Sequence, residues 1–319
     1  MTSVLIVGAG GVGLVYAKYL LDHGVRVAVV ARSNYEAIKS KGVTIEYPNF
    51  EDKPDVKFNV DVYKSGEPYS GEKFDYIVVA SKIQENQAVR GLEQYAKDDA
   101  LIVLAQNGID IETPYIEAYP SLELASAVVK TQVALNGPTL VTYYSDYLSI
   151  VAGLVHGKNE AKLRALCELS ENAGLSQFEF TDNILSERWS KLLWNTPMNG
   201  LAAATNLELQ ALFELGFEPV MRQVALEVWT VGKAIVGDDF VPEAFIDQLI
   251  NFTKNRSMEG FLPSTLQDVR KGRPIEHEVL CGNIVKAAKR VNVPVPQLEM
   301  LDRMLVAINY RLQRQGSRM

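Results

Sequence analysis

Hydrophobic and polar residues follow two different patterns in the first and second parts of the chain. Up to Thr181, short apolar runs alternate with turns and with segments of helical periodicity, as in a parallel sheet covered by helices. The clearest apolar runs are Val4–Val7, Val25–Ala31, Phe74–Ser81 and Ala100–Ala105. Beyond Thr181 the apolar residues recur with the period of helices. The pattern predicts an α/β Rossmann-type dinucleotide-binding domain over residues 1–182 and an all-α domain over residues 183–319.

Less regular hydrophobic patterns predict further strands and helices in both domains. Gly42–Val62 alternates like short or edge strands, because Pro48 and Pro54 interrupt it. Further strands are expected at Leu124–Leu135, Thr139–Tyr144, Tyr147–Ala152 and Ser176–Phe180, with a helix at Glu160–Asn172. In the second domain, prolines 219, 242, 263 and 294 are placed to open or stop helices. At 319 residues, two domains that share a cleft are expected, without a flexible linker near Asp182.

A glycine-rich turn follows the first apolar run and reads Gly8-x-Gly10-x-x-Gly13. In a dinucleotide site this spacing provides a sharp turn, a close approach of backbone to pyrophosphate, and tight packing of the next helix on the strand. That helix would direct its first N–H groups at the phosphates. Three glycines in such a window also occur in ordinary loops, but the strand before them and the helical periodicity after them favour a dinucleotide.

The residues at the end of the second strand indicate whether the dinucleotide is NAD or NADP. An NAD enzyme usually has an acidic residue about twenty positions after the glycines, which holds the ribose hydroxyls. Here the strand ends Ala31-Arg32-Ser33. A guanidinium attracts a 2′-phosphate, whereas a carboxylate would repel it. We therefore expect NADPH/NADP+ as the cofactor, the alternative being that Arg32 is a solvated residue after a strand.

Two polar residues follow other predicted strands. Lys82 comes after the run that ends at Ser81, and Asn107 follows the run that ends at Ala105. Open α/β sheets bind their ligands at the carboxyl ends of the strands, so both positions suit contact with cofactor and substrate. A surface lysine and a turn asparagine explain them equally well, because Asn-Gly is also a common turn dipeptide.

The first helix of the second domain carries the strongest candidate for catalysis. Lys191 and Asn195 are one helical turn apart and share a face, and Asn199 continues the row beyond a kink expected at Pro197. Lys191 lies among apolar residues, and partial burial would lower its pKa toward that of a proton donor near neutral pH. The alternative is a lysine that extends from the edge of an apolar face into solvent.

A second polar cluster lies late in the chain and contains Ser264 and Glu276. Ser264 follows Pro263 and suits a helix N-cap, and Glu276 suits the first turn of a helix. Periodicity does not distinguish these structural roles from functional ones.

Composition and charge exclude several classes of protein. Hydrophobic residues make up 47% and charged residues 22%, as in globular proteins, and the net charge of −7 argues against a general nucleic-acid or anionic-membrane surface. The first strand starts at Ser3, which leaves no room for a signal or transit peptide, so a cytoplasmic location is expected. Cys167 and Cys281 suggest buried, reduced thiols, and the three histidines have no metal-ligand spacing.

Five motifs occur together in this chain: GAGGVG at the start, ASK and QNG after two strands, W-x-K-x-x-x-N-x-x-x-N from Trp189 to Asn199, and S-x-L-Q-D followed eight residues later by Glu276. Together they resemble the ketopantoate reductase family of 2-dehydropantoate 2-reductases. The resemblance implies reduction of ketopantoate to (R)-pantoate by NADPH, on the route to pantothenate and coenzyme A. It implies a small-molecule 2-oxo acid as the substrate and is compatible with a homodimer.

The resemblance also implies roles for individual residues. Lys191 would be the general acid with Glu276 as its active-site partner, and the substrate would contact Asn195, Asn199 and Ser264. The implied cofactor-binding residues are Gly8, Gly10, Gly11, Val12, Gly13, Arg32, Lys82 and Asn107, and no metal is implied.

Three departures from the family pattern leave the 2-oxo acid open: Gln106 before Asn-Gly, Pro197 within the asparagine row, and Pro274-Ile275 before the glutamate. The alternative enzyme is a 3-hydroxyacid dehydrogenase of the 6-phosphogluconate or hydroxyisobutyrate kind. A non-catalytic NADP(H) sensor and a structural protein with a Rossmann-like shell are the alternatives without catalysis.

Overall fold

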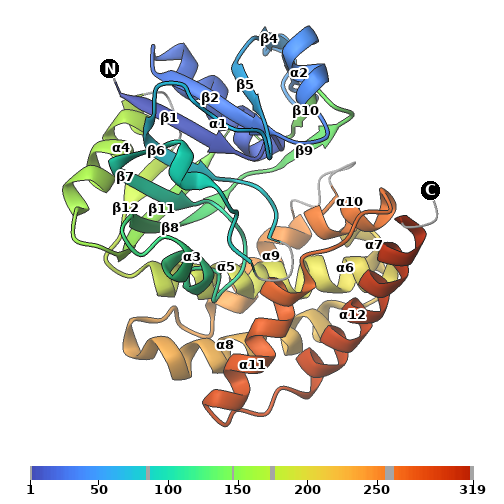
Figure 1. Ribbon diagram of the computed structural model, residues 1–319. Helices are drawn as coiled ribbons and strands as arrows, with labels where there is room; N and C mark the ends of the chain where they lie inside the picture. The colour runs from blue at the N-terminus through green and yellow to red at the C-terminus, as the bar shows by residue number, and fades with distance from the viewer. Residues whose placement is uncertain (1, 84–86, 146, 173–176, 256–261, 317–319) are drawn as a thin grey trace. The chain divides into compact units, whose positions relative to one another are not determined.

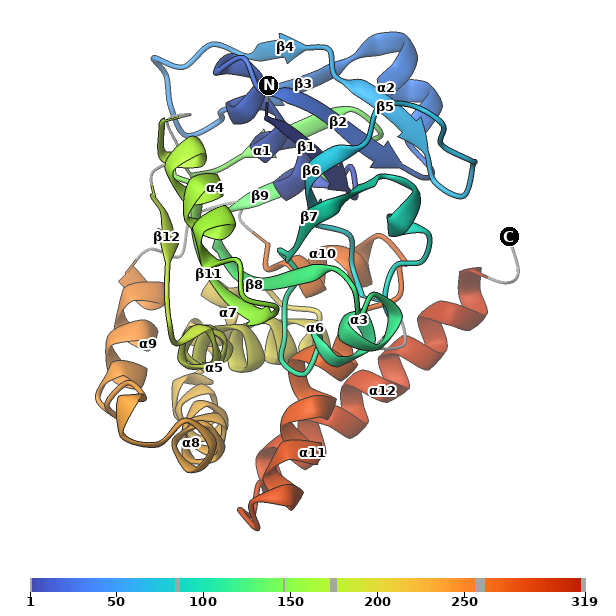
Figure 2. The same ribbon diagram turned by 60° about the vertical axis from the view of Figure 1, so that its left-hand side comes forward.

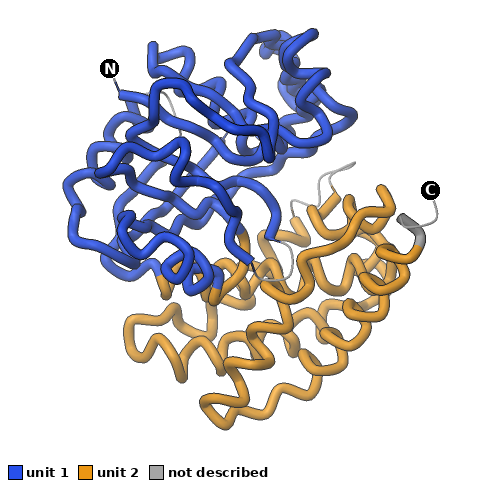
Figure 3. Tube along the Cα trace, in the orientation of Figure 1, with its two compact units in different colours: residues 1–83, 87–106, 111–184 blue, residues 84–86, 107–110, 185–319 orange. Residues whose placement is uncertain are grey.

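A computed structural model of the protein describes residues 2–83, 87–145, 147–172, 177–255 and 262–316. The chain forms two compact units (Figure 3). Unit 1 comprises Met1–Ile83, Gln87–Gln106 and Ile111–Ile184. Unit 2 comprises Leu185–Met319 together with two short stretches from earlier in the chain, Gln84–Asn86 and Asn107–Asp110. The sequence did not predict that Asn107–Asp110 belongs to unit 2.

An eight-stranded sheet forms the centre of unit 1, in the order β12-β11-β8-β7-β6-β1-β2-β5 (Figures 1 and 2). Its strands are β1 (Ser3–Val7), β2 (Arg26–Ala31), β5 (Asp61–Lys64), β6 (Phe74–Val79), β7 (Ala96–Leu104), β8 (Glu123–Lys130), β11 (Ser149–His156) and β12 (Gln177–Phe180). Within the described residues all neighbours run parallel except β8 and β11. The apolar runs of the sequence are these strands, because a parallel sheet is buried on both faces. Ser176, the first residue of one predicted strand, lies outside the described residues.

Helices and short helical turns complete unit 1. They are α1 (Gly11–Asp22), α2 (Tyr35–Lys41), the 3₁₀ turn Leu92–Gln94, α3 (Thr113–Ala118) and α4 (Glu160–Asn172). The bounds of α4 are those that periodicity predicts, whereas α2 and α3 are too short to produce a periodic signal. A buried hydrogen bond of 2.8 Å joins the Tyr16 hydroxyl of α1 to Ser170 Oγ of α4. This hydrogen bond links the two helices.

A second sheet of four strands covers the other side of α1. Its strands are β3 (Val43–Glu46), β4 (Val56–Phe58), β9 (Val133–Asn136) and β10 (Leu140–Tyr143), in the order β4-β3-β10-β9. The predicted single strand Leu124–Leu135 is wrong, because β8 ends at Lys130 and β9 joins the second sheet. The break is held by Ser145 Oγ, which accepts a hydrogen bond of 3.1 Å from Gln132 N.

All the regular secondary structure among the described residues of unit 2 is helical. Its helices are α5 (Ile184–Trp194), whose first residue lies in unit 1, α6 (Gly200–Thr205), α7 (Leu209–Glu214), α8 (Glu218–Val236), α9 (Phe245–Asn255), α10 (Ser264–Arg270), α11 (Asn283–Arg290) and α12 (Pro296–Gly316), with a 3₁₀ turn at Gly237–Asp239. Trp189 of α5 is fully buried and packs at Gly232 of α8, where a Cβ would lie 3.1 Å from the indole. None of the described helices combines the length and the apolar character needed to cross a membrane.

Two π-helical turns interrupt the helices of unit 2, at Asn195–Asn199 and at Glu278–Gly282. The kink expected at Pro197 takes this form, since the wide turn accommodates a residue that has no N–H to donate. Thr196 Oγ1 of the first turn donates a hydrogen bond of 2.8 Å to Leu280 O of the second. The turns are therefore fixed against each other.

The two cysteines are buried and unpaired, as expected from the sequence. Burial raises the pKa of the Cys167 thiol to about 12, and it also raises the pKa of Cys281. Both side chains therefore act as small apolar residues rather than as reactive thiols.

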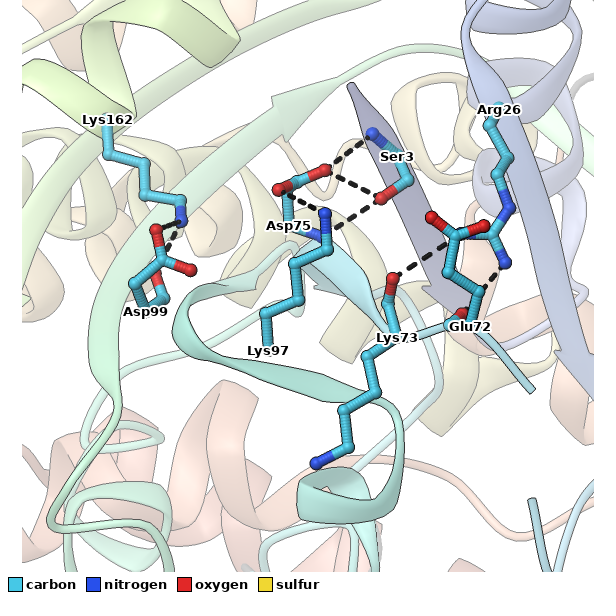
Figure 4. A network of polar contacts seen from close by, with 8 residues as sticks. All are labelled: Ser3, Arg26, Glu72, Lys73, Asp75, Lys97, Asp99 and Lys162. Atoms are coloured by element: carbon cyan, nitrogen blue, oxygen red, sulfur yellow. Dashed lines mark hydrogen bonds and ion pairs between the residues drawn. The ribbon is translucent and has the colours of Figure 1, made fainter. Parts of the chain in front are cut away.

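A network of polar contacts closes the amino-terminal edge of the main sheet (Figure 4). Asp75 Oδ2 accepts hydrogen bonds from Ser3 N (2.9 Å) and Ser3 Oγ (2.7 Å), and Asp75 Oδ1 pairs with Lys97 Nζ at 2.8 Å. Partial burial would raise the pKa of Asp75, but the hydrogen bonds from Lys97 and Ser3 outweigh it and hold the pKa below its usual value. The folded state therefore favours the ionised carboxylate.

This network predicts a stability that depends on pH. A carboxyl group whose pKa is lowered by folding stabilises the protein above its unfolded pKa of about 3.9, and loses this effect as the pH falls. Thermal unfolding measured between pH 6 and pH 3 should show a steeper loss of Tm for the wild type than for Asp75→Asn. Asp98→Asn, at an exposed position on the same strand as Lys97, is the control. Equal slopes for all three proteins would mean that Asp75 contributes nothing.

Candidate functional site

The three glycines of the predicted motif lie in and next to the turn from β1 to α1. The space around a Cβ atom differs at each of the three positions. Gly8 has φ of +116°, and a Cβ there would lie 2.5 Å from Ser81 N. A Cβ on Gly13 would lie 2.3 Å from Gly8 O, so the helix approaches the strand more closely than a side chain permits. At Gly10 nothing lies within 4 Å of the Cβ position. Two glycines are therefore required by the fold, and the third keeps the approach to the backbone open.

The first turn of α1 is suited to bind an anion. It begins after Gly10 without a hydrogen bond from a capping side chain and contains no acidic residue. Its first N–H groups have no intrahelical acceptors, and the positive end of the helix dipole lies here. Gly11 contacts Val133 of β9, and Val12 packs against the core. The turn therefore fits the pyrophosphate of a dinucleotide.

Asn34 holds this turn in place, which sequence reasoning missed. Its Nδ2 donates hydrogen bonds to Ala9 O at 2.9 Å and to Pro138 O at 3.3 Å. The residue follows β2 by three positions, and the sequence carried no motif that marked it.

Arg32 and Lys82 are exposed at the carboxyl edge of the sheet. Arg32 directly follows β2, and Lys82 lies three residues after β6. Because β6, β1 and β2 are adjacent and parallel, these residues and Gly8 belong to the same edge. Arg32 makes no hydrogen bond or ion pair with the described part of the chain. Its guanidinium is therefore available to an anionic ligand.

Two consecutive residues after β7, Gln106 and Asn107, belong to different units. Gln106 belongs to unit 1 and is buried, with Nε2 donating to Ser81 O at 2.7 Å. Asn107 belongs to unit 2, where its Oδ1 accepts a hydrogen bond of 2.8 Å from Lys191 Nζ. Asn107 was predicted beside the cofactor, and the structure brings it to the candidate catalytic lysine.

Lys191 lies on α5 in a setting of mixed polarity. The side chains of Trp189, Leu192 and Leu193 are buried, whereas Lys191 itself is partly exposed. A lysine that extends from the edge of an apolar face into solvent would show the same partial exposure. Asn107 Oδ1 gives the ammonium a fixed acceptor within unit 2. Such a lysine combines a held position with access to a ligand.

Three predicted substrate-binding residues come together at the first π-helical turn. Asn199 Oδ1 accepts hydrogen bonds from Thr265 N at 3.1 Å and from Ser264 Oγ at 3.3 Å, so Asn199 caps α10. Ser264 is the first residue of α10, and its predicted role as the N-cap is wrong because Pro263 occupies that position. Asn195 is 6% exposed, and its amide atoms are not among the fully buried polar atoms that lack a hydrogen-bond partner.

Glu276 is partly buried and directly precedes His277 and the second π-helical turn. Its carbonyl oxygen accepts a hydrogen bond of 3.3 Å from Leu280 N. Burial lowers the pKa of His277 despite the nearby carboxylates of Asp302 and Glu278, so the imidazole beside Glu276 is neutral near pH 7. Because Thr196 bonds Leu280, the turn that follows Glu276 is connected to the turn that carries Asn195 and Asn199.

Two family models match most of the chain. The model described as ketopantoate reductase PanE/ApbA covers residues 4–156, and the model of the C-terminal part of the same family covers residues 183–309. These matches include every predicted site residue.

Individual proteins are similar over nearly the whole length. An uncharacterised protein of Saccharomyces cerevisiae is 27% identical over 98% of this chain and 95% of its own length. The 2-dehydropantoate 2-reductase of Nostoc sp. is 26% identical over 96% of this chain and 95% of its own. The crystal structure of 2-dehydropantoate 2-reductase from Methylococcus capsulatus superimposes with a TM-score of 0.82 at 28% identity, covering 97% of each chain. The same fold occurs in D-mandelate dehydrogenase with NADH and anilino(oxo)acetate, with a TM-score of 0.83 at 20% identity over 98% of this chain and 99% of that chain.

Proposed function

This chain belongs to the ketopantoate reductase family, and we propose that it reduces 2-dehydropantoate, or a closely related branched 2-oxo acid, with NADPH. The coarser activity, oxidoreduction between CH–OH and C=O groups, follows from the family. The observation that carries the finer proposal is the arrangement in unit 2, where Asn107 Oδ1 accepts a hydrogen bond of 2.8 Å from Lys191 Nζ, one helical turn before Asn195.

We assign cofactor binding to unit 1. The uncapped first turn of α1 and the backbone at Gly10 would bind the pyrophosphate, with Gly8, Gly11, Val12 and Gly13 shaping the turn. Arg32 would pair with the 2′-phosphate, and Lys82 lies at the same sheet edge. When bound, NADPH supplies the hydride for the ketone carbon.

We assign proton transfer to Lys191. As the ketone carbon gains a hydride, its oxygen gains a negative charge and needs a proton. The Lys191 ammonium stabilises this charge and then donates the proton from Nζ, so that the products are the 2-hydroxy acid and a neutral amine. Asn107 Oδ1 orients Nζ for this transfer. Glu276 is the proposed partner that supports the positive charge of the lysine.

We assign substrate binding to Asn195, Asn199 and Ser264. Amide N–H groups and a hydroxyl suit the carboxylate and the hydroxyl of 2-dehydropantoate. The Oδ1 atom of Asn199 caps α10, and in this proposal the Nδ2 donors of Asn199 serve the ligand. Donors, rather than acceptors, are what a carboxylate requires.

The test is NADPH consumption, followed by absorbance, with a panel of 2-oxo acids. Ketopantoate should give the highest kcat/KM in a panel with pyruvate, 2-oxoisovalerate, 2-oxoisocaproate and the 2-oxo acid that corresponds to mandelate. The last compound is included because D-mandelate dehydrogenase shares the fold. Absence of turnover with every compound, despite saturable NADPH binding by intrinsic fluorescence, would instead indicate a sensor. Absence of both would indicate a protein that binds no nucleotide.

A further inference from the structure

The segment Asn107–Asp110, here called the 107–110 segment, is fixed to unit 2 along its whole length. It supplies Asn107, the hydrogen-bond partner of Lys191. Each of the next three residues has its own attachment to a helix or turn of unit 2. A loop that needed only to connect two elements would not require an attachment at every residue.

The attachment of Gly108 is buried. Its carbonyl oxygen accepts a hydrogen bond of 2.9 Å from Nη1 of Arg188, a residue that is 4% exposed. Gly108 has φ of +96°, and a Cβ there would lie 2.4 Å from Val279 O. The backbone therefore contacts the second π-helical turn directly. Burying a guanidinium costs free energy unless its N–H donors have hydrogen-bond acceptors. The bond to Gly108 O therefore matters more to Arg188 than a similar bond would to an arginine on the surface.

Ile109 and Asp110 are attached to the following helix. Asn283 Nδ2, in a residue that is 2% exposed, donates to Ile109 O at 2.8 Å, and Ile109 N donates to Val279 O at 3.3 Å. Asp110 makes an exposed ion pair of 2.8 Å with Arg290. The hydrogen bonds to Gly108 and Ile109 are thus buried, whereas the ion pair of Asp110 is exposed.

Arg188 and Lys191 are three residues apart on α5 and share a face of the helix. Two hydrogen bonds leave this face for two consecutive residues of the segment: Lys191 Nζ to Asn107 Oδ1, and Arg188 Nη1 to Gly108 O. Helix and segment therefore form a closed ring of contacts. Within this ring, the guanidinium fixes the backbone next to Asn107, and Asn107 fixes the ammonium.

We propose that Arg188 is a positioning residue for the reaction: it holds the 107–110 segment so that Asn107 orients the Lys191 ammonium. The proposal rests on the proposed function, because it assigns to Lys191 the proton transfer. Arg188 itself touches neither substrate nor cofactor in this proposal and acts only through Asn107.

A double-mutant cycle tests this route. Asn107→Ala should lower kcat about tenfold and Arg188→Gln about fivefold, with the KM for NADPH unchanged in both. Because Arg188 acts through Asn107, the double variant should be no slower than Asn107→Ala alone. A merely structural role of Arg188 would instead multiply the two losses, and that result would overturn the proposal. Arg290→Gln, which removes the exposed ion pair of the same segment, should leave kcat unchanged.

Hydrogen exchange provides a second readout that needs no substrate. In Arg188→Gln the amide of Ile109 should exchange at least about tenfold faster than in the wild type, while amides in the core of α8 are unchanged. If Arg188→Gln does not fold, Asn283→Ala removes a neighbouring attachment and should give the same exchange and the same non-additivity with Asn107→Ala. Unchanged exchange at Ile109 would overturn the proposal even if the enzyme is active. If the wild type reduces no 2-oxo acid while Ile109 responds as expected, the proposed function fails and the attachment stands.

Discussion

Replacing Lys191 by alanine should lower kcat by about 10²- to 10⁴-fold, with the affinity for NADPH nearly unchanged. Positioned proton transfer contributes about this factor, which corresponds to roughly 3–5 kcal/mol of transition-state stabilisation. The side chain is partly exposed, and its hydrogen bond to Asn107 is within unit 2. Removing it should therefore not disturb the glycine turn of unit 1. The loss should appear in kcat and kcat/KM together, since the interaction with the oxyanion exists only in the transition state.

Steady-state rates with the best 2-oxo acid and a fluorescence titration with NADPH measure this prediction. Lys233→Ala is a matched control. Lys233 is a lysine of α8 in unit 2, and its side chain makes an exposed ion pair with Asp238 in the 3₁₀ turn that follows this helix. It should retain wild-type kcat. A Lys191→Ala enzyme with near-normal kcat at saturating substrate would remove the lysine from the mechanism.

Reversing the charge at Arg32 should change the choice of cofactor. Arg32→Asp replaces an attraction for the 2′-phosphate by a repulsion, so the KM for NADPH should rise by about 100-fold, consistent with a charged hydrogen bond of about 1.5–3 kcal/mol. NADH has no phosphate at this position, and its KM should change little. The exposed place of Arg32 after β2 makes a large loss of stability unexpected.

The ratio of kcat/KM for NADPH to that for NADH is the quantity to compare. Lys158→Asp, at another exposed position of unit 1, makes the same change of net charge and should leave the ratio unaltered. Equal damage to both cofactors by Arg32→Asp would show that Arg32 has a structural role only, and the assignment of NADPH would then lose its support.

Features that show as a local spacing of residues were predictable from the sequence. The glycine motif is an example, because its three positions were read from their spacing; the structure then supplied a reason for two of them, since a Cβ at Gly8 or Gly13 would lie within 2.5 Å of backbone. The buried parallel strands appear as apolar runs, and α4 shows its bounds through its periodicity. The row from Lys191 to Asn199 was likewise visible as a helical spacing. Its site roles remain predictions.

Tertiary structure alone decided which distant residues meet. Arg188 bonds a carbonyl 80 residues earlier, and Asn283 bonds one 174 residues earlier. Likewise, Gln132, between β8 and β9, donates its N–H to Ser145, which lies 13 residues later in the chain. Periodicity describes which face of an element is apolar, whereas the partner of a polar group depends on which elements pack together. For this reason the sequence indicated Lys191 and Asn107 separately, and only the fold placed them 2.8 Å apart within the helical unit.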